Sequence, residues 1–325
     1  MTIPPNPPLV TALGCVTISC PEPARLVAFL REGLDWAVAT QGPIDSALER
    51  LWGIAAGSAG KAHWVLHAAK SDFGMIRVVQ GADRYPTRPI GTRWTGCEIV
   101  VMEDIDGLHQ RLVAFPGYTH MRPPHDVDFT SVGSNIHRVF TGRAPGGTHF
   151  GFTMAVTQPK GRPFPSALTP VGHIFAAHLV SSDYAKSHAF YSDGLGMVQY
   201  FKAHMTEGGW HTSWKLPAGT PVDLGLFRGD GPNSAAVGSL EMQGYDNVHV
   251  DAVPWVRDRL DGGACIGTFT TRDIDAAFAA VRGSGVATIL SEPQAVKMAP
   301  YGGGRAFCFL GPSGERVEIA ERFAP

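Results

Sequence analysis

Three ionisable side chains in the second half of the chain interrupt stretches that are otherwise mostly apolar: His178, Glu241 and Glu318. The stretches are residues 174–180, 237–243 and 316–320, and each has the length and composition of a β-strand. Histidine titrates near neutral pH, and a carboxylate in apolar surroundings has a raised pKa that makes it a better base. The three residues are therefore candidates for acid–base chemistry. The structural alternatives are a core histidine and carboxylates that face the solvent.

A glycine-rich segment, Tyr301-Gly302-Gly303-Gly304-Arg305, precedes another predicted strand. Glycines let the backbone move or approach a ligand closely, while a phenol and a fixed cation flank them here. We therefore expect Tyr301 and Arg305 to close over a substrate and to stabilise negative charge that develops on it. The alternative is an ordinary hairpin turn. A phosphate loop is excluded because no Lys-Ser/Thr pair and no helix follow.

Aromatic and histidine side chains gather on the predicted strands 199–204 and 211–216. A tryptophan wall suits a planar aromatic substrate, although tryptophan is also a common core residue. We predict that these side chains contact the substrate together with Glu241. The set is His204, Trp210, His211 and Trp214.

An internal repeat organises the chain, since residues 28–36 match residues 189–197 in type at almost every place. Both segments read as the end of an amphipathic helix that closes on Gly-Leu, where glycine readily adopts positive φ. A second repeat links residues 103–108 to residues 272–277. The chain therefore consists of two similar halves, each with two units of one strand, one helix and several further strands.

The two halves predict two domains. They cover residues 1–156 and 172–325, and residues 157–171 form a proline-rich linker. Within the first half, we expect a strand at residues 52–56 and a long loop at residues 116–136. A loop of that length is usually functional or disordered.

Composition excludes several classes of protein. The 325 residues are 44% hydrophobic and 17% charged, which is typical of a globular protein, and the formal charge of -2 gives no footprint for nucleic acid. No apolar run is long enough to span a bilayer, and the proline-rich start is no signal peptide. Five cysteines without a CxxC pair argue against a disulfide framework. We therefore expect a cytoplasmic protein that contacts neither membrane nor nucleic acid.

The repeated helix end at residues 189–197 and the closing segment at residues 311–318 resemble the vicinal oxygen chelate superfamily, which contains glyoxalase I, bleomycin-resistance proteins and extradiol dioxygenases. The resemblance implies an α+β fold of four βαβββ modules, paired into two open β-barrel-like domains around cavities. It does not imply one reaction, because the family includes isomerases, lyases, dioxygenases and simple binders.

The family usually binds a divalent metal through the first and last strands of its modules. Counting seven residues back from the acid that opens each helix gives Cys97, Ala176 and Ile266, and matching the modules gives Cys15. On the last strands, the matching positions are Arg77, Gly151, Glu241 and Glu318. Since alanine and isoleucine cannot coordinate a metal, we expect no complete metal site. If iron, manganese or zinc is bound, the ligands are His178, two residues along from Ala176, with Glu241 and Glu318.

These observations favour an enzyme that acts on a small aromatic or carbonyl-bearing metabolite by lyase or isomerase chemistry. His178 and Glu318 share the acid–base work, and the reaction passes through an enol or quinoid intermediate. Two alternatives stay open: a metal-dependent extradiol-type dioxygenase and a non-catalytic protein that sequesters its ligand. Exposed sheet edges make a homodimer a further expectation.

Overall fold

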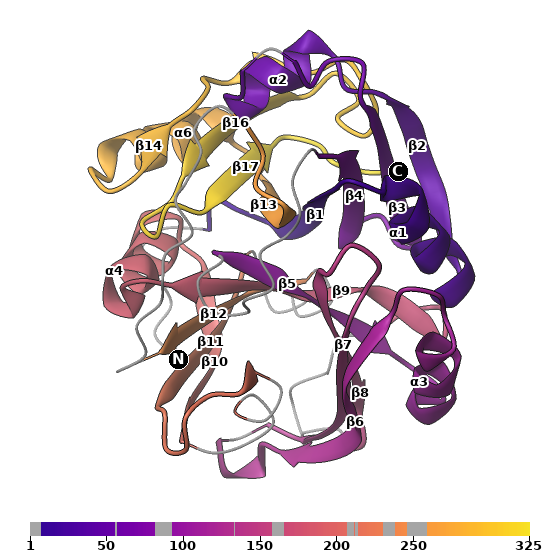
Figure 1. Ribbon diagram of the computed structural model, residues 1–325. Helices are drawn as coiled ribbons and strands as arrows, with labels where there is room; N and C mark the ends of the chain where they lie inside the picture. Colours follow the sequence, from indigo (N-terminus) through magenta and orange to yellow (C-terminus); the bar gives the residue numbers. More distant parts are fainter. Residues whose placement is uncertain are drawn as a thin grey trace.

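The computed structural model describes residues 8–55, 57–81, 93–132, 134–157, 166–206, 211, 214–229, 238–245 and 259–325. These residues form two large β-sheets that pack against each other, with helices along their sides (Figure 1). No helix within these ranges combines the length and apolarity that a membrane crossing requires.

The first half of the chain contains two modules. The first consists of β1 (Ala12–Cys20), α1 (Pro23–Ala28), η1 (Phe29–Gly33), β2 (Trp36–Pro43), α2 (Ser46–Trp52), β3 (Ala62–Ala68) and β4 (Met75–Gln80). The second consists of β5 (Trp94–Val101), α3 (Ile105–Val113), β6 (Thr119–Asp128), η2 (Thr130–Val132), β7 (Ile136–Arg143) and β8 (His149–Ala155).

The second half repeats the pattern. The third module consists of β9 (Val171–Ser181), α4 (Tyr184–Ala189), η3 (Phe190–Gly194), β10 (Val198–Met205), β11 (Val222–Arg228) and β12 (Ser239–Tyr245). The fourth consists of β13 (Gly263–Thr270), α6 (Ile274–Gly283), β14 (Thr288–Ile289), β15 (Gln294–Ala295), β16 (Arg305–Leu310) and β17 (Arg316–Ala320). The α+β fold of four modules is thus confirmed.

The modules pair across the two halves of the sequence. Sheet A has the order β14-β16-β17-β13-β1-β4-β3-β2 with β15 beside β16, so it joins the first module to the fourth. Sheet B has the order β10-β11-β12-β9-β5-β8-β7-β6 and joins the second module to the third. The expectation that residues 1–156 and 172–325 form separate domains is therefore wrong for the sheets. The first strand of every module offers a free edge, and the similar modules gave no signal of which edges would pair.

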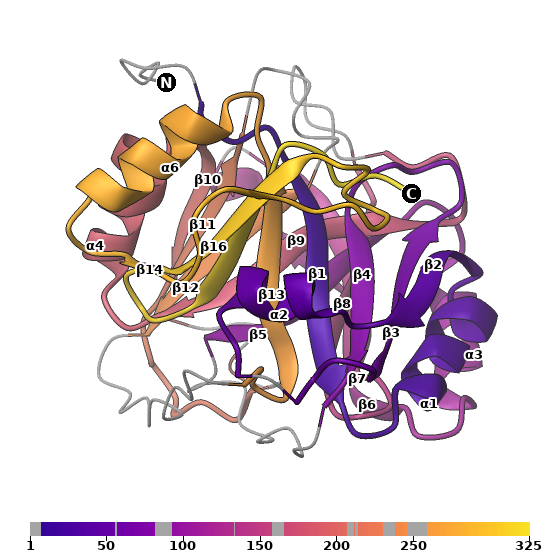
Figure 2. The same ribbon diagram turned by 90° about the horizontal axis from the view of Figure 1, so that it is seen from above.

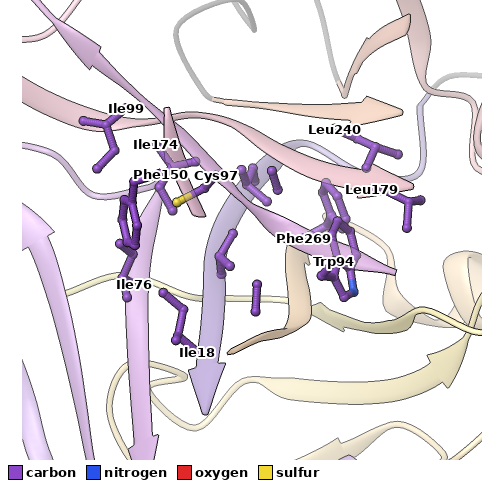
Figure 3. Close-up of a cluster of buried hydrophobic side chains, with 14 of the residues drawn as sticks. Ile18, Ile76, Trp94, Cys97, Ile99, Phe150, Ile174, Leu179, Leu240 and Phe269 are labelled. Carbon is purple, nitrogen blue, oxygen red and sulfur yellow. The ribbon is translucent and has the colours of Figure 1, made fainter. Parts of the chain in front are cut away.

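The main core lies between the two sheets. Figure 3 shows Phe269 of β13 beside Trp94 of β5, with Ile18 of β1 and Leu179 of β9 in the same cluster. Trp94 also donates from Nε1 to the carbonyl of Arg316, which ties β5 to β17. Cys97 lies in this core as an apolar residue. Each sheet therefore turns its other face, here called the outer face, away from its partner.

Three local predictions were wrong. Residues 46–52 form helix α2, capped by the Asp45 carboxylate, where a strand was expected to start at residue 52. Much of the expected loop 116–136 is strand β6, paired with β7. His211 and Trp214 are helical, not on a strand. In Figures 1 and 2, α2 lies against the outer face of sheet A.

Candidate metal centre

Each sheet has four equivalent positions at its middle, where first and last strands of two modules lie side by side. In sheet B, His178 of β9 is in register with Glu241 of β12, and Glu98 of β5 is in register with Gly151 of β8. In sheet A, the equivalent pairs are Thr268 with Glu318 and Thr17 with Arg77. Alternate residues of a strand share a face, so all eight residues belong to outer faces.

In sheet B, these positions bring together Glu98, His178 and Glu241. Their ligand atoms all lie within 4.8 Å of one another. His178 Nε2 is 3.8 Å from Glu98 Oε2 and 3.7 Å from Glu241 Oε2. All three residues are buried. Two carboxylates and one imidazole in this arrangement form a set of donors that suits a divalent cation.

The carboxylate of Glu241 is held by a chain of hydrogen bonds along its own strand. Gln243 donates from Nε2 to Glu241 Oε1 at 2.5 Å, and the Tyr245 hydroxyl donates to Gln243 Oε1 at 2.5 Å. Burial raises the pKa of Glu241, although the nearby His178 lowers it in part. One oxygen of Glu241 is thus occupied by Gln243, and the other faces His178. Hydrogen bonds of this kind orient metal ligands in proteins.

The electrostatics of His178 follow from the two carboxylates. Burial lowers the pKa of His178, but Glu241 and Glu98 outweigh burial, so the pKa is raised overall. The salt bridges of Glu98 and Glu241 within the described ranges are both with His178. A single imidazolium cannot neutralise two buried carboxylates, and buried charges in proteins are paired or bind metals. The group therefore has the charge of a cation site.

Aromatic side chains and a second histidine surround the triad. The ring of His149 lies 5.8 Å from that of His178 and 5.5 Å from that of Trp214. Trp214 in turn packs 5.9 Å from Tyr245. Burial, with smaller contributions from His178 and Arg143, lowers the pKa of His149 to about 3. This side of sheet B is thus aromatic, with a neutral imidazole beside the triad.

In sheet A, the equivalent carboxylate is paired with a cation of the chain itself. Arg77 donates from Nη2 to Glu318 Oε1 at 3.2 Å and from Nε to Thr17 Oγ1 at 2.9 Å. Glu318 also accepts hydrogen bonds from Trp52 Nε1 at 2.8 Å, Tyr301 at 2.9 Å and Thr268 at 3.0 Å. We call this group the Arg77–Glu318 cluster. Every polar atom in it has a protein partner.

Helix α2 fills the outer face of sheet A. Its residues Leu48, Leu51 and Trp52 belong to one apolar cluster with Met75 and Tyr301. The guanidinium carbon of Arg77 lies 4.8 Å from the centre of the Trp52 ring, within the range of a cation–π contact. Sheet A therefore has a packed second core where sheet B has its candidate site.

The structure divides the predicted catalytic residues between three places. His178 lies in sheet B together with Glu241, whereas Glu318 and Tyr301 are in the Arg77–Glu318 cluster of sheet A. The side chain of Arg305 forms surface ion pairs with Asp275 and Glu321. His178 and Glu318 therefore cannot share one acid–base step, because they lie on the outer faces of different sheets. Tyr301 is buried and bonded to Glu318, so the expected role in a closing segment is not supported.

The predicted substrate contacts also separate. Trp214 and Glu241 lie at the site in sheet B. His204 is exposed and pairs with Asp223, while His211 Nε2 lies 2.7 Å from the carbonyl of Thr220. Both therefore have roles away from the triad. Trp210 lies outside the described residues.

Glu98 was missed because the ligand on each first strand was expected seven residues before the acid that caps the following helix, and this spacing is too long. His178 lies five residues before Asp183, and Thr268 lies five before Asp273. In β5, which has register shifts, Glu98 lies six residues before Asp104. The expectation that Glu318 would complete a metal site with His178 and Glu241 is corrected, since Glu98 takes that place. A carboxylate inside the apolar run 97–101 was the available signal.

Comparisons with known proteins agree with this fold. Residues 171–319 match the family model described as Glyoxalase/Bleomycin resistance protein/Dioxygenase superfamily. No curated protein sequence matches the chain. The structure is similar to glyoxalase I from Zea mays, with 15% identity, a TM-score of 0.65, and coverage of 96% of this chain and 92% of that chain. A putative dioxygenase from Bacillus subtilis subsp. subtilis str. 168 has 14% identity, a TM-score of 0.58, and coverage of 96% and 86%. At these identities the structural matches show the fold alone.

Proposed function

Since residues 171–319 match the model of the Glyoxalase/Bleomycin resistance protein/Dioxygenase superfamily, we propose that the chain is a metal-dependent enzyme acting on a small carbonyl-bearing or aromatic molecule. The proposed reaction is proton transfer, as in lyases and isomerases. The observation that carries the proposal is the buried group of Glu98, His178 and Glu241.

The donor set favours one branch of metal chemistry. Non-haem iron oxygenases typically use two histidines and one carboxylate, whereas this group has one histidine and two carboxylates. Oxygen-rich ligands suit Mn²⁺, Zn²⁺ and other ions that do not need to change oxidation state. When bound, such an ion polarises a substrate oxygen as a Lewis acid. Lyase or isomerase chemistry therefore fits these residues better than oxygen activation does.

The two carboxylates are suited to different tasks. Glu241 is fixed through Gln243 and its side chain is 3% exposed, whereas the side chain of Glu98 is 11% exposed. We therefore assign Glu241 to a fixed ligand of the metal and Glu98 to a second ligand whose carboxylate also accepts a proton from the substrate beside His178. Trp214 and Tyr245 exclude water from this side of the sheet and offer flat surfaces to a planar ligand.

An exchange assay tests this proposal. Protein loaded in turn with Mn²⁺, Zn²⁺ or Co²⁺ is incubated in D2O with a panel of hydroxyketones, hydroxyaldehydes and hydroxylated aromatic ketones, and NMR follows hydrogen–deuterium exchange beside the carbonyl. We expect metal-dependent exchange with at least one compound. Glu98→Gln is expected to slow exchange by about 100-fold, a typical contribution of a general base. The surface variant Arg305→Met serves as the control and keeps the rate.

Two results would contradict the proposal. Consumption of dissolved oxygen by the iron-loaded protein, without exchange, would assign it to the dioxygenases. Tight binding of a panel compound that is never exchanged or converted would make it a binding protein.

A further inference from the structure

His149 is a buried polar residue for which the fold gives no structural role. The residue is 3% exposed, and neither ring nitrogen has a hydrogen-bond partner within the residues that the structure describes. Leaving a buried polar group without a partner costs on the order of 1–3 kcal/mol. A protein keeps such a group where a ligand supplies the missing bond.

His149 lies on the same face of sheet B as the candidate centre. It lies two residues before Gly151 on β8, and these residues share the outer face of sheet B with Glu98. Gly151 occupies the last of the four equivalent positions and brings no side chain. A Cβ at Gly151 would lie 3.3 Å from Cγ of Glu98, so a larger residue there would crowd that carboxylate.

His149 is nevertheless outside the triad. The group whose ligand atoms lie within 4.8 Å of one another contains only Glu98, His178 and Glu241. The ring of His149 is 5.8 Å from that of His178, close enough for a small molecule beside the triad to reach both. The geometry thus favours contact with a ligand of the centre over contact with the metal itself.

Sheet A supplies a matched position. Met75 is the equivalent of His149, because it precedes Arg77 by two residues and pairs with Cys15 as His149 pairs with Gly96. Met75 is fully buried in the apolar cluster around α2. Where the outer face of the sheet is packed, this position is apolar, and where the candidate centre lies, it is a histidine.

We propose that His149 binds the oxygen-bearing ligand of the centre by a hydrogen bond, as a substrate-positioning residue contributed by β8. A neutral imidazole donates from one nitrogen and accepts at the other, so it recognises a carbonyl or hydroxyl oxygen without adding charge. This inference rests on the proposed function, since it requires a metal at Glu98, His178 and Glu241.

Azide binding to the cobalt-loaded protein tests the proposal. Azide is a small anion, and its binding to Co²⁺ is followed by visible absorption. We expect His149→Leu to bind Co²⁺ within about threefold of the wild-type affinity and to bind azide about tenfold more weakly, the loss of one hydrogen bond. His149→Gln, which keeps a donor, recovers most of the azide affinity. Met75→Leu is the matched control and changes neither affinity, and urea unfolding verifies that all variants fold.

The outcomes separate the two proposals. If the wild-type protein does not bind Co²⁺, the metal centre and the proposed function are both wrong. If Co²⁺ and azide bind His149→Leu as tightly as wild type, the centre stands and the role of His149 is refuted. If His149→Leu loses its Co²⁺ affinity, His149 is a metal ligand and the role proposed here is also refuted.

Discussion

The two sheets place different chemistry at equivalent positions. Glu318 of sheet A and Glu241 of sheet B are equivalent buried carboxylates on last strands. Glu318 is neutralised by Arg77 and bonded by Trp52 and Tyr301. Glu241 faces a histidine and a second carboxylate instead. The Glu318 arrangement is electrostatically complete, and we propose that a cation from outside the chain completes the Glu241 arrangement.

The largest loss of stability is expected when the Arg77–Glu318 cluster of sheet A is broken. Arg77→Met leaves Glu318 buried without a cation, which typically costs about 3–5 kcal/mol of unfolding free energy. The double variant Arg77→Met/Glu318→Leu removes both charges and is expected to recover part of that loss. Urea denaturation measures both. An Arg77→Met protein as stable as wild type would mean that the Arg77–Glu318 cluster does not hold sheet A together.

A hydrogen bond between residues of the two sheets' modules makes the unfolding free energy depend on pH, by about 3 kcal/mol. Glu315, in the turn before β17, accepts from the hydroxyl of Tyr191 in η3 at 2.7 Å. Burial outweighs the hydrogen bonds to Glu315 and raises its pKa to about 7. Between pH 4.5 and 7 the unfolded chain releases this proton and the folded chain keeps it, so stability falls as pH rises and levels off above pH 7.

Urea unfolding of Glu315→Gln at pH 5 and pH 8 measures this contribution. Between pH 5 and pH 8, the unfolding free energy of the variant is expected to fall by about 3 kcal/mol less than that of wild type. The exposed variant Glu22→Gln is the control and follows the wild-type profile. Parallel profiles for wild type and Glu315→Gln would show that Glu315 is ionised in the folded protein.

Smaller effects are expected when one hydrogen bond behind each buried carboxylate is removed, on stability in sheet A and on metal affinity in sheet B. Trp52→Phe removes a donor to Glu318 and is expected to cost about 2 kcal/mol of stability without changing metal affinity. Tyr245→Phe removes the support of Gln243 behind Glu241. It is expected to weaken metal binding by about tenfold, with little loss of stability. Calorimetric metal titration and urea denaturation of both variants test this; equal effects of the two substitutions on metal affinity would contradict it.

The fold was accessible from the sequence for a physical reason. The helix caps Asp104, Asp183 and Asp273 are local signals that recur in three of the four modules, and the repeated helix end recurs in the first and third. The pairing of modules was not accessible, because similar first strands can pair in more than one combination. The packing of α2 onto the outer face of sheet A could not be predicted either. Helix α2 is short, and its Trp52 donates a hydrogen bond to Glu318, which lies 266 residues further along the chain.

The candidate site was accessible in part. His178 and Glu241 could be identified as polar residues in apolar strands, and Trp214 as an aromatic beside them. Glu98 was missed because the count of seven residues back from the helix cap was too long, and register shifts in β5 make its spacing differ from that of the other first strands. Glu318 was misassigned because the pattern of a buried carboxylate is the same whether its partner is a metal or Arg77. Only the three-dimensional arrangement distinguishes these cases.

We infer that sheet B binds a divalent cation and that sheet A does not. Calorimetric titration of Mn²⁺, Zn²⁺ and Co²⁺ into metal-free wild type, Glu241→Gln and Glu318→Gln tests it most directly, because the two substitutions remove equivalent carboxylates. We predict one site per chain in wild type and wild-type affinity in folded Glu318→Gln. Loss of a residue that only supports a metal ligand costs about 10- to 100-fold in affinity, so loss of the Glu241 carboxylate itself is expected to weaken binding by at least about 100-fold. Unchanged affinity in Glu241→Gln, or its loss in a folded Glu318→Gln, would contradict this account.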